Sequence, residues 1–168
     1  SYSLAGVAEI EDLDASSADA IIDLTGSDSN NRITGNNNDN IIDGGLGDDL
    51  MIGGSGNDTY TIDSLSDFIT ENFNDGNDTV IWNEDTLVTY TIGATINNVE
   101  NIDASGSDSI VTINGDANIN VIIGNGNDNI FNAGSGIDTM VGGDGDDVYN
   151  IDFVSEVITE LNGEGFDV

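Results

Sequence analysis

The sequence predicts an all-β fold in which short parallel strands coil into a solenoid. Four nine-residue blocks follow one another at residues 26–61, and four blocks with the same layout recur at residues 115–150. Each block has one large apolar residue at its eighth position, and the last two blocks of each set approximate G-G-x-G-x-D-x-U-x, where U is a large apolar residue. A short regular period of this kind indicates coils that bury their apolar faces only against neighbouring coils.

The eighth position of each block is the predicted core. The residues at this position are Ile33, Ile42, Met51 and Tyr60 in the first set, and Ile122, Phe131, Met140 and Tyr149 in the second. A period of nine fits no face of an α-helix, because about 3.6 residues per turn would scatter these side chains around the cylinder. The period instead fits short strands that each place one side chain in a shared interior.

The glycine-rich half of each block predicts a tight turn that carries a carboxylate. A chain that reverses within about six residues needs positive φ angles or close backbone approach, and glycine allows both. The turn glycines are Gly44, Gly45, Gly47, Gly53, Gly54 and Gly56 in the first set, and Gly134, Gly136, Gly142, Gly143 and Gly145 in the second. The sixth-position carboxylates are Asp49, Asp58, Asp138 and Asp147. Carboxylate and carbonyl oxygens together make a hard, all-oxygen site that suits calcium.

The first two blocks of each set depart from this pattern. Asparagine replaces the sixth-position aspartate, at Asn31 and Asn40 in the first set and at Asn120 and Asn129 in the second. An amide oxygen can bind calcium but brings no charge. We therefore expect these blocks to bind calcium weakly or to serve as structural coils, and we keep Asn40 and Asn129 as candidate ligands. Asp39 and Asp128, one position earlier, are candidates for supplying the missing charge.

The chain contains two copies of a longer module. Residues 9–79 align with residues 98–168 without a gap. We assign residues 1–97 to the first copy and 98–168 to the second. The coils are expected at about residues 17–61 and 106–150, each followed by a less regular β segment, at 62–97 in the first copy and truncated in the second. Since the chain begins and ends inside a module, we expect it to be part of a longer protein.

The segment after each set of coils is less regular and also acidic. Residues 79–82 and 87–92 are apolar or alternate, which predicts two strands with a turn at 83–85. The acids Asp63, Asp67, Glu71 and Asp78 recur in the second copy as Asp152, Glu156, Glu160 and Asp167. If alternate blocks share a sheet, Asp67 stacks on Asp49 and Glu156 on Asp138, since the members of each pair are two blocks apart. These acids bind further calcium or form a solvated acidic face, and the sequence favours neither.

Composition excludes several classes of function. The chain has 33 acidic residues and one basic residue, and its formal charge of −32 repels nucleic acid and anionic membranes. It lacks cysteine and histidine, and therefore a thiolate zinc site and the usual general base. No apolar stretch is long enough to insert into a bilayer. Acids in periodic turns form no general acid–base constellation, so we expect no catalysis and no organic cofactor in this segment.

Disorder is the alternative interpretation of such an acidic chain. Hydrophobic residues nevertheless make up 37% of the sequence and stand in register. Two carboxylates on neighbouring strands would lie about 5 Å apart and repel each other by roughly 3 kcal/mol at an effective dielectric constant of about 20. A domain is stable by only about 5–15 kcal/mol, so a few such pairs would unfold it. We therefore predict a chain that is disordered without divalent cations and folded with them.

The ninth position tests a further possibility, a flat outward ladder of the kind that ice binding requires. Read block by block, this position holds Thr34, Asp43, Ile52 and Thr61, and then Ile123, Asn132, Val141 and Asn150. Because the residue type changes from block to block, we predict no ladder of matched side chains and no ice binding.

Together these residues resemble a known family. GGSGNDTYT at residues 53–61 and GGDGDDVYN at residues 142–150 are similar to the nonapeptide repeats of RTX proteins, the hemolysin-type calcium-binding repeats. The resemblance implies a right-handed parallel β-roll in which successive nonapeptides alternate between two sheets, so that two nonapeptides make one turn. It also implies several calcium ions, held by turn carbonyls and sixth-position carboxylates. Export by a type I pathway, unfolded inside the cell and folding outside, is implied as well.

Two functions stay open at this level. RTX tracts occur in toxins, proteases, lipases, adhesins and surface-layer proteins, in the extracellular space or on the cell surface. The duplication favours a repeated structural unit of an adhesin or surface array, whose partners would be calcium, further copies of the module and other matrix or surface components. The alternative is a C-terminal secretion and folding module of an exported enzyme or toxin. A catalytic domain elsewhere in the polypeptide would indicate the alternative, and many further modules the structural unit.

Overall fold

The chain is built from β-strands, and no described residue lies in a helix. A computed structural model describes residues 1–4, 6, 10–82, 88–91, 96–109, 111–152, 155–160 and 165–168. The chain divides into two compact units, Ser1–Ile81 with Ala94–Val99, and Trp82–Gly93 with Glu100–Val168. Among the described residues, no helix has the length and apolar character needed to cross a membrane.

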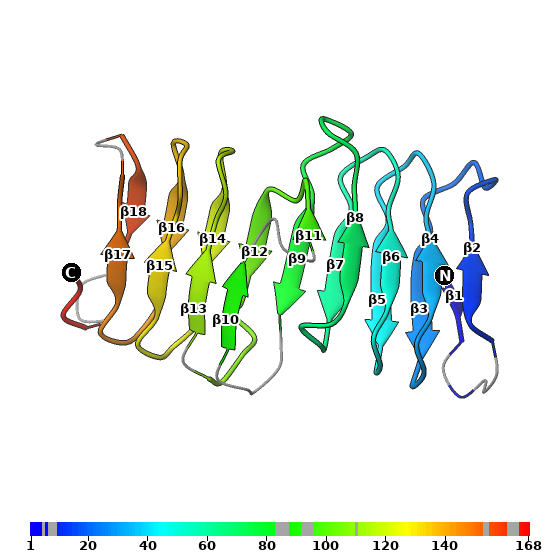
Figure 1. The fold of residues 1–168 in the computed structure, drawn as a ribbon, viewed down its shortest axis with the longest axis horizontal. Coiled ribbons are helices and arrows are strands. Elements are labelled where there is room, and N and C mark those ends of the chain that lie inside the picture. Colours follow the sequence, from blue (N-terminus) through cyan, green and yellow to red (C-terminus); the bar gives the residue numbers. More distant parts are fainter. Residues whose placement is uncertain are drawn as a thin grey trace. The chain divides into compact units, whose positions relative to one another are not determined.

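The first unit has two parallel sheets, and successive strands alternate between them (Figure 1). One sheet has the order β1-β3-β5-β7-β9 and the other the order β11-β8-β6-β4-β2. In Figure 1 the arrows of β3, β5 and β7 point opposite to those of β4, β6 and β8, as the two halves of a coil require. The strands are β1 (Tyr2–Ser3), β2 (Asp12–Asp14), β3 (Asp23–Ser27), β4 (Arg32–Thr34), β5 (Ile41–Gly45), β6 (Leu50–Ile52), β7 (Thr59–Ile62), β8 (Phe68–Thr70), β9 (Thr79–Trp82) and β11 (Ile96–Asn97).

The second unit repeats this arrangement. Its sheets have the orders β10-β13-β15-β17 and β12-β14-β16-β18. The strands are β10 (Val88–Thr91), β12 (Asn101–Asp103), β13 (Val111–Asn114), β14 (Val121–Ile123), β15 (Ile130–Asn132), β16 (Thr139–Val141), β17 (Val148–Asn150) and β18 (Val157–Thr159). The all-β parallel solenoid predicted from the sequence is confirmed in both units.

Partner strands in the glycine-rich coils are two nonapeptide blocks apart. Ile42 aligns with Tyr60 in one sheet of the first unit, and Ile33 aligns with Met51 in the other. One turn of the solenoid therefore contains two nonapeptide blocks, as the resemblance implied.

The eighth-position side chains form the core of each unit, as predicted. All eight are buried, and seven of them are completely inaccessible; Tyr149 is 9% exposed. The rings of Phe131 and Tyr149 stack, with centroids 4.9 Å apart and planes 4° from parallel. Burial of one side chain of this size contributes about 1.5–3 kcal/mol, so a regular apolar ladder favours the fold strongly. The acidic turns lie at the edge of this core.

Tight turns at the predicted glycines are confirmed at the second and fourth positions of the G-G-x-G blocks. These glycines have φ angles between +84° and +151°, a region that side-chain-bearing residues rarely adopt. They are Gly45, Gly47, Gly54, Gly56, Gly134, Gly136, Gly143 and Gly145. The first-position glycines do not have positive φ angles, so a different reason must explain why glycine stands at that position.

The segment after the first set of coils contains strands but breaks the nine-residue period. β9 and β10 confirm the strands predicted at 79–82 and 87–92, while the predicted turn at 83–85 lies outside the described residues. The number of residues from one coil to the next also increases here. The N–H of Asp58 donates to Asp78 Oδ1, which lies beyond the position that two nonapeptide blocks would reach. This longer step changes which acidic side chains meet.

The prediction that no outward ladder exists was wrong for one sheet. Alternate blocks share a sheet, so a ninth-position residue stacks on the one two blocks away and not on that of the next block. Asn114, Asn132 and Asn150 align on β13, β15 and β17. Asn132 Nδ2 donates to Asn114 Oδ1 at 2.6 Å, and Asn150 Nδ2 donates to Asn132 Oδ1 at 2.7 Å. The amides of this ladder therefore bond one another in series.

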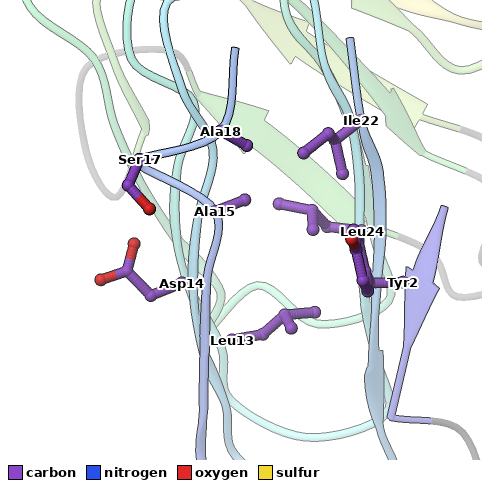
Figure 2. Close-up of a pocket in the computed structure, with 8 residues that line it drawn as sticks. All are labelled: Tyr2, Leu13, Asp14, Ala15, Ser17, Ala18, Ile22 and Leu24. Carbon is purple, nitrogen blue, oxygen red and sulfur yellow. The ribbon is translucent and has the colours of Figure 1, made fainter. Parts of the chain in front are cut away.

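A cavity of about 300 Å³ lies in the first unit, between the strands on either side of the first coil. Figure 2 shows Leu13, Ala15 and Ala18 on one side of it and Tyr2, Ile22 and Leu24 on the other. In the second unit, Tyr90 pairs with Ile113 as Tyr2 pairs with Leu24 in the first. Tyr90 is only 4% exposed and its ring lies 5.6 Å from that of Trp82, whereas Tyr2 is 62% exposed. The two copies thus differ in how this end of the apolar interior is covered.

Candidate functional site

The sixth-position aspartates lie inside the turns, where each joins two successive coils. Asp49, Asp58, Asp138 and Asp147 are all almost completely buried. In each case Oδ1 accepts the backbone N–H of the sixth-position residue one coil earlier. The N···O distances are 2.7 Å from Asn31 to Asp49, 2.7 Å from Asn40 to Asp58, 2.8 Å from Asn120 to Asp138 and 2.6 Å from Asn129 to Asp147. The two-block register produces this contact, because it places each sixth position beside the one a full coil before it.

The second oxygen of these four carboxylates has no hydrogen-bond partner among the described residues. Oδ2 is buried in Asp49, Asp58, Asp138 and Asp147 alike. An unbonded buried polar atom costs about 1–3 kcal/mol, and more when the group is charged. The same unbonded atom in four turns indicates a ligand that these side chains do not themselves provide.

Burial also raises the pKa of these carboxyls. It raises the pKa of Asp49 and of Asp58 to about 6, although the backbone hydrogen bond to each carboxylate acts in the opposite direction. Burial likewise raises the pKa of Asp138 and Asp147. Charged carboxylates are therefore unfavourable in these turns unless a cation joins them.

The sixth-position asparagines differ, because neighbouring groups satisfy both ends of the amide. Asn120 Oδ1 accepts the N–H of Asp116 at 3.0 Å, and Asn120 Nδ2 donates to the carbonyl of Glu100 at 3.2 Å. Asn31 is bonded in the same way, with Oδ1 accepting from Ser27 and Nδ2 donating to Ile10. The asparagine coils therefore close their turns with protein hydrogen bonds alone.

Asn40 and Asn129, the two asparagines proposed as ligands, have the same kind of bonding. Their Oδ1 atoms accept the N–H groups of Asn36 and Asn125 at 2.8 and 3.2 Å. Their role as ligands stays a prediction, and the structure gives each amide oxygen a protein donor already.

Asp39 and Asp128, proposed to supply charge to the asparagine coils, lie on the outer side of the turns. Asp39 Oδ1 accepts the N–H of Asn57 at 2.7 Å, and Asp128 Oδ1 accepts that of Asp146 at 2.9 Å. Both contacts join residues two blocks apart, so these aspartates link the outer rims of successive coils.

Asp67 lies one coil beyond Asp49, as the two-block spacing predicts. Its Oδ1 accepts the N–H of Asp49 at 2.9 Å, and its Oδ2 accepts those of Asp63 and Ser64 at 3.2 Å each. Asp67 is buried, and burial raises its pKa. Glu156, its counterpart in the second copy, is half-buried and accepts the N–H of Asp152 at 3.3 Å. Both remain predicted ligands, and at Asp67 the peptide N–H groups occupy both oxygens.

A cluster that the predicted ligand set did not contain forms where the step between coils lengthens. Asp58, Glu71 and Asp78 bring one carboxylate oxygen each to within 4.8 Å of one another, and all three residues are buried. Asp147, Glu160 and Asp167 form the same cluster in the second unit, where Glu160 is half-buried and Asp167 is exposed. The aspartates of the coils, Asp58 and Asp147, were predicted as ligands. For Glu71, Asp78, Glu160 and Asp167 the sequence left calcium binding and a solvated acidic face open.

A tyrosine and a glycine shape this cluster. The hydroxyl of Tyr60 donates to Glu71 Oε1. A Cβ atom added at Gly53 would overlap Asp58 Oδ2, the Tyr60 hydroxyl and Glu71 Oε1. The first-position glycine therefore leaves room for converging oxygens, which explains a glycine without a positive φ angle.

The cluster recurs around Gly142 in the second unit. The Tyr149 hydroxyl donates to Glu160 Oε1, and a Cβ at Gly142 would overlap the Tyr149 hydroxyl, Asp147 Oδ2 and Glu160 Oε1. The joint recurrence of the tyrosine and the glutamate in the two copies is the sequence signal that could have identified both clusters.

Electrostatics in the first cluster follow from burial. Desolvation raises the pKa of Glu71 to about 7; the Tyr60 hydrogen bond opposes the rise, while Asp78 and Asp58 add to it. Desolvation and the nearby Glu71 carboxylate raise the pKa of Tyr60 as well, so this phenol stays protonated and acts as a donor. The protein thus holds three buried acids together with no compensating positive group.

Comparison with protein families identifies the coils. The model of the RTX calcium-binding nonapeptide repeat matches residues 25–60, 105–140 and 123–150. The chain carries RTX calcium-binding nonapeptide repeats. The matched ranges cover the glycine turns and the sixth-position aspartates of both RTX sets. Searches of curated proteins and of solved structures gave no match.

Proposed function

We propose that this RTX chain is a calcium-dependent folding module of a secreted or cell-surface protein, without catalytic activity of its own. The observation that supports the proposal is the unbonded, buried Oδ2 atom of Asp49, Asp58, Asp138 and Asp147. Each of these atoms is a buried acceptor near other acids, as at Asp49, where Asp67 and Asp63 add to the rise in its pKa that burial causes.

The chain has almost no positive charge with which to satisfy these acceptors. Its single basic residue is Arg32, on β4, and that guanidinium donates to Thr34 at 3.1 Å. Neutralisation of the acidic turns must therefore come from protons or from a bound cation. RTX repeats bind calcium, which takes six to eight oxygen ligands at about 2.3–2.6 Å.

In the proposed sites, sixth-position carboxylates bind the ion together with backbone carbonyls of the turn glycines. The carboxylates also hold successive coils together through their Oδ1 atoms, so the residues that would bind calcium are the residues that stack the coils. Binding free energy then becomes folding free energy, since the unfolded chain has no preformed site.

Calcium titration tests the proposal. Adding calcium to protein stripped with a chelator is expected to produce β-sheet circular dichroism cooperatively, and magnesium is expected to do so poorly because it demands a compact octahedral site. The thermal midpoint is expected to rise with calcium concentration, since each tenfold increase above saturation adds about 1.4 kcal/mol per site to the free energy of unfolding. A spectrum and a midpoint that chelation leaves unchanged would contradict the proposal.

For the whole protein, we propose a repeated structural unit of an adhesin or surface array. The support is the duplication, in which the coils, the sixth-position acids and the Tyr–Glu contacts of the first copy all recur in the second. Stacked modules of this kind build length, which suits an extended surface protein. The sequence of the complete polypeptide tests this: many further modules would support it, and one catalytic domain followed by these two copies alone would contradict it.

A further inference from the structure

We infer that Asp58, Glu71 and Asp78 form a second kind of divalent-cation site, and that Asp147, Glu160 and Asp167 form its copy. This inference rests on the proposed calcium-dependent folding. It differs from the nonapeptide sites because two of its three acids come from the segment after the coils. Each module would thus contain one such site in addition to those in its glycine turns.

The spacing of the three carboxylates fits one coordination sphere. One oxygen from each of Asp58, Glu71 and Asp78 lies within 4.8 Å of the other two. Calcium binds oxygen at about 2.4 Å, so two ligands on opposite sides of the ion are about 4.8 Å apart. Small side-chain rotations would therefore let all three oxygens contact a single ion without a change in the course of the backbone.

Two of these acids have an unbonded oxygen inside the protein. Asp58 is 1% exposed and Glu71 is 4% exposed, and neither Asp58 Oδ2 nor Glu71 Oε2 has a hydrogen-bond partner among the described residues. The remaining oxygens are occupied: Asp58 Oδ1 accepts the N–H of Asn40, and Glu71 Oε1 accepts the Tyr60 hydroxyl. The atoms without partners are thus the ones left to bind a ligand.

Tyr60 and Gly53 give the cluster the character of a built site. The Tyr60 hydroxyl fixes one oxygen of Glu71, which determines where the other oxygen lies. Gly53 leaves the space in which the Asp58, Tyr60 and Glu71 oxygens converge. Tyr60 also belongs to the buried eighth-position ladder, so the core itself positions the glutamate.

A cation here would fasten the less regular segment to the last coil of the set. Glu71 directly follows β8, Asp78 precedes β9, and Asp58 belongs to the turn before β7. Within the first unit, Asn98 Nδ2 donates to the backbone carbonyl of Glu71 at 2.8 Å, which adds a further connection to the same point. The site would therefore make the less regular segment fold with the coils.

Ion counting in Glu71→Gln tests the inference. Glutamine keeps the shape and can still accept from Tyr60, but it brings no charge. With calcium, native mass spectrometry is expected to find one ion fewer in Glu71→Gln and two fewer in Glu71→Gln/Glu160→Gln. Glu11→Gln is the matched control, since Glu11 is exposed and the change in charge is equal; it is expected to keep the full count.

The outcomes separate this inference from the proposed function. If the unchanged protein binds no calcium, the proposed function fails. If it binds calcium and the Glu71→Gln/Glu160→Gln variant keeps every ion, the clusters are hydrogen-bonded acids held by protons, and only this inference fails.

Terbium luminescence provides a readout that does not depend on how well the glutamine variants fold. Terbium occupies calcium sites, and when the ion is excited directly its emission does not require a neighbouring tyrosine. Tyr60→Phe/Tyr149→Phe keeps the rings in the core and removes the hydroxyls. We expect it to raise the half-saturating terbium concentration of these sites about tenfold or more, as loss of a group that orients a ligand does. An unchanged titration would overturn the inference. Tyr2→Phe, at an exposed ring, is the control.

Discussion

Two kinds of coil occur in this chain, and at the sixth position their side chains differ by one atom, an amide nitrogen in place of a carboxylate oxygen. At the sixth position, the asparagine coils have an amide nitrogen that donates to a neighbouring carbonyl or amide, as from Asn120 to Glu100. The aspartate coils have a carboxylate oxygen in the corresponding place, and it has no partner in Asp49 or Asp138 among the residues that the structure describes. The first kind closes its turn with protein groups, and the second leaves an acceptor for a cation. Stability that depends on calcium should therefore be concentrated in the aspartate coils.

The order of the two kinds along the chain is the same in both sets. The asparagine coils come first and the aspartate coils follow, next to the Tyr60 and Tyr149 clusters. Coils whose turns are closed by protein hydrogen bonds can thus provide a stacked surface on which the aspartate coils assemble. This order places the dependence on calcium at the end of each set that leads into the less regular segment.

Alanine at Gly53, in the turn of an aspartate coil, should have the largest effect. A methyl group there would overlap three oxygens of the coil and its cluster. At Gly126, in the turn of an asparagine coil, the nearest atom would be 3.9 Å away and φ is not positive, so alanine fits. We expect Gly53→Ala to destabilise the calcium-loaded protein by about 3 kcal/mol, at the upper end of overpacking costs.

Gly126→Ala is the control, with an expected change of less than about 1 kcal/mol in either direction, since alanine also restricts the unfolded chain. Chemical denaturation at saturating calcium measures both free energies of unfolding. Equal losses would show that glycine is needed in the turns for its backbone freedom and not for the space around the carboxylates.

Replacing a sixth-position aspartate by asparagine should stabilise the metal-free protein and destabilise the calcium-loaded protein. In Asp49→Asn the buried charge disappears, so we expect the metal-free protein to gain about 1–3 kcal/mol, the cost of an unsatisfied buried group. In calcium the same variant is expected to be less stable than the original, because a ligand is lost. Denaturation measures the effect in calcium, and the folded fraction by circular dichroism, as a stabilising osmolyte is added, measures it in chelator. Asp48→Asn, at the exposed neighbour, should change both far less, because the Asp48 charge adds less to the raised pKa of Asp49 than burial does. If Asp49→Asn were less stable both in chelator and in calcium, the proposed difference between aspartate and asparagine coils would be wrong.

The fold could be predicted from the sequence because its signals are local and periodic. The apolar residue at every eighth position, from Ile33 to Tyr149, and the glycine turns are repeated often enough to define the coil without any knowledge of long-range contacts. The nonapeptide aspartates could be predicted for the same reason.

The nine-residue period could not predict contacts in the segments where the spacing departs from nine residues. The distances along the chain from Asp58 to Glu71 and to Asp78 are not multiples of the nonapeptide, so no register argument brings these acids together. The asparagine ladder was missed for a related reason, since Asn114, Asn132 and Asn150 alternate with unrelated ninth-position residues of the opposite sheet. Both features depend on which strands share a sheet, which is a property of the folded chain.

The pH dependence of stability should have opposite directions with and without calcium. An aspartate has an ordinary pKa of 3.8, whereas Asp49 and Asp58 have pKa values of about 6 and Glu71 one of about 7 in the folded protein. A carboxyl with a raised folded pKa favours folding while it is protonated, and this contribution is lost as pH rises through the folded value. The metal-free protein should therefore lose stability between about pH 4 and pH 7.

Calcium competes with protons for the same oxygens, so its stabilising effect should be complete above about pH 7 and decline below about pH 6. Thermal midpoints at pH 5 and pH 8 in saturating calcium, and the folded fraction by circular dichroism at the same pH values in chelator, test both directions. The Asp49→Asn variant should show a smaller dependence on pH in chelator, which separates the buried groups from the general repulsion of an acidic surface. The same direction of pH dependence in chelator and in calcium would mean that protons and calcium act at different groups.

Removing one amide from the outward asparagine ladder should have the smallest effect. Asn132 donates to Asn114 and accepts from Asn150, but all of these contacts lie on the outer face of a sheet and none involves a carboxylate. Asn132→Ala should cost about 1 kcal/mol or less, as two hydrogen bonds at the surface are replaced by bonds to water. The loss should be the same in chelator-treated and calcium-loaded protein wherever both are folded, and the calcium midpoint should not move. If the calcium midpoint did move, the asparagine ladder on the outer face would be coupled to calcium binding in the turns. The parts of a coil whose stability depends on calcium would then include the outer face of the sheet.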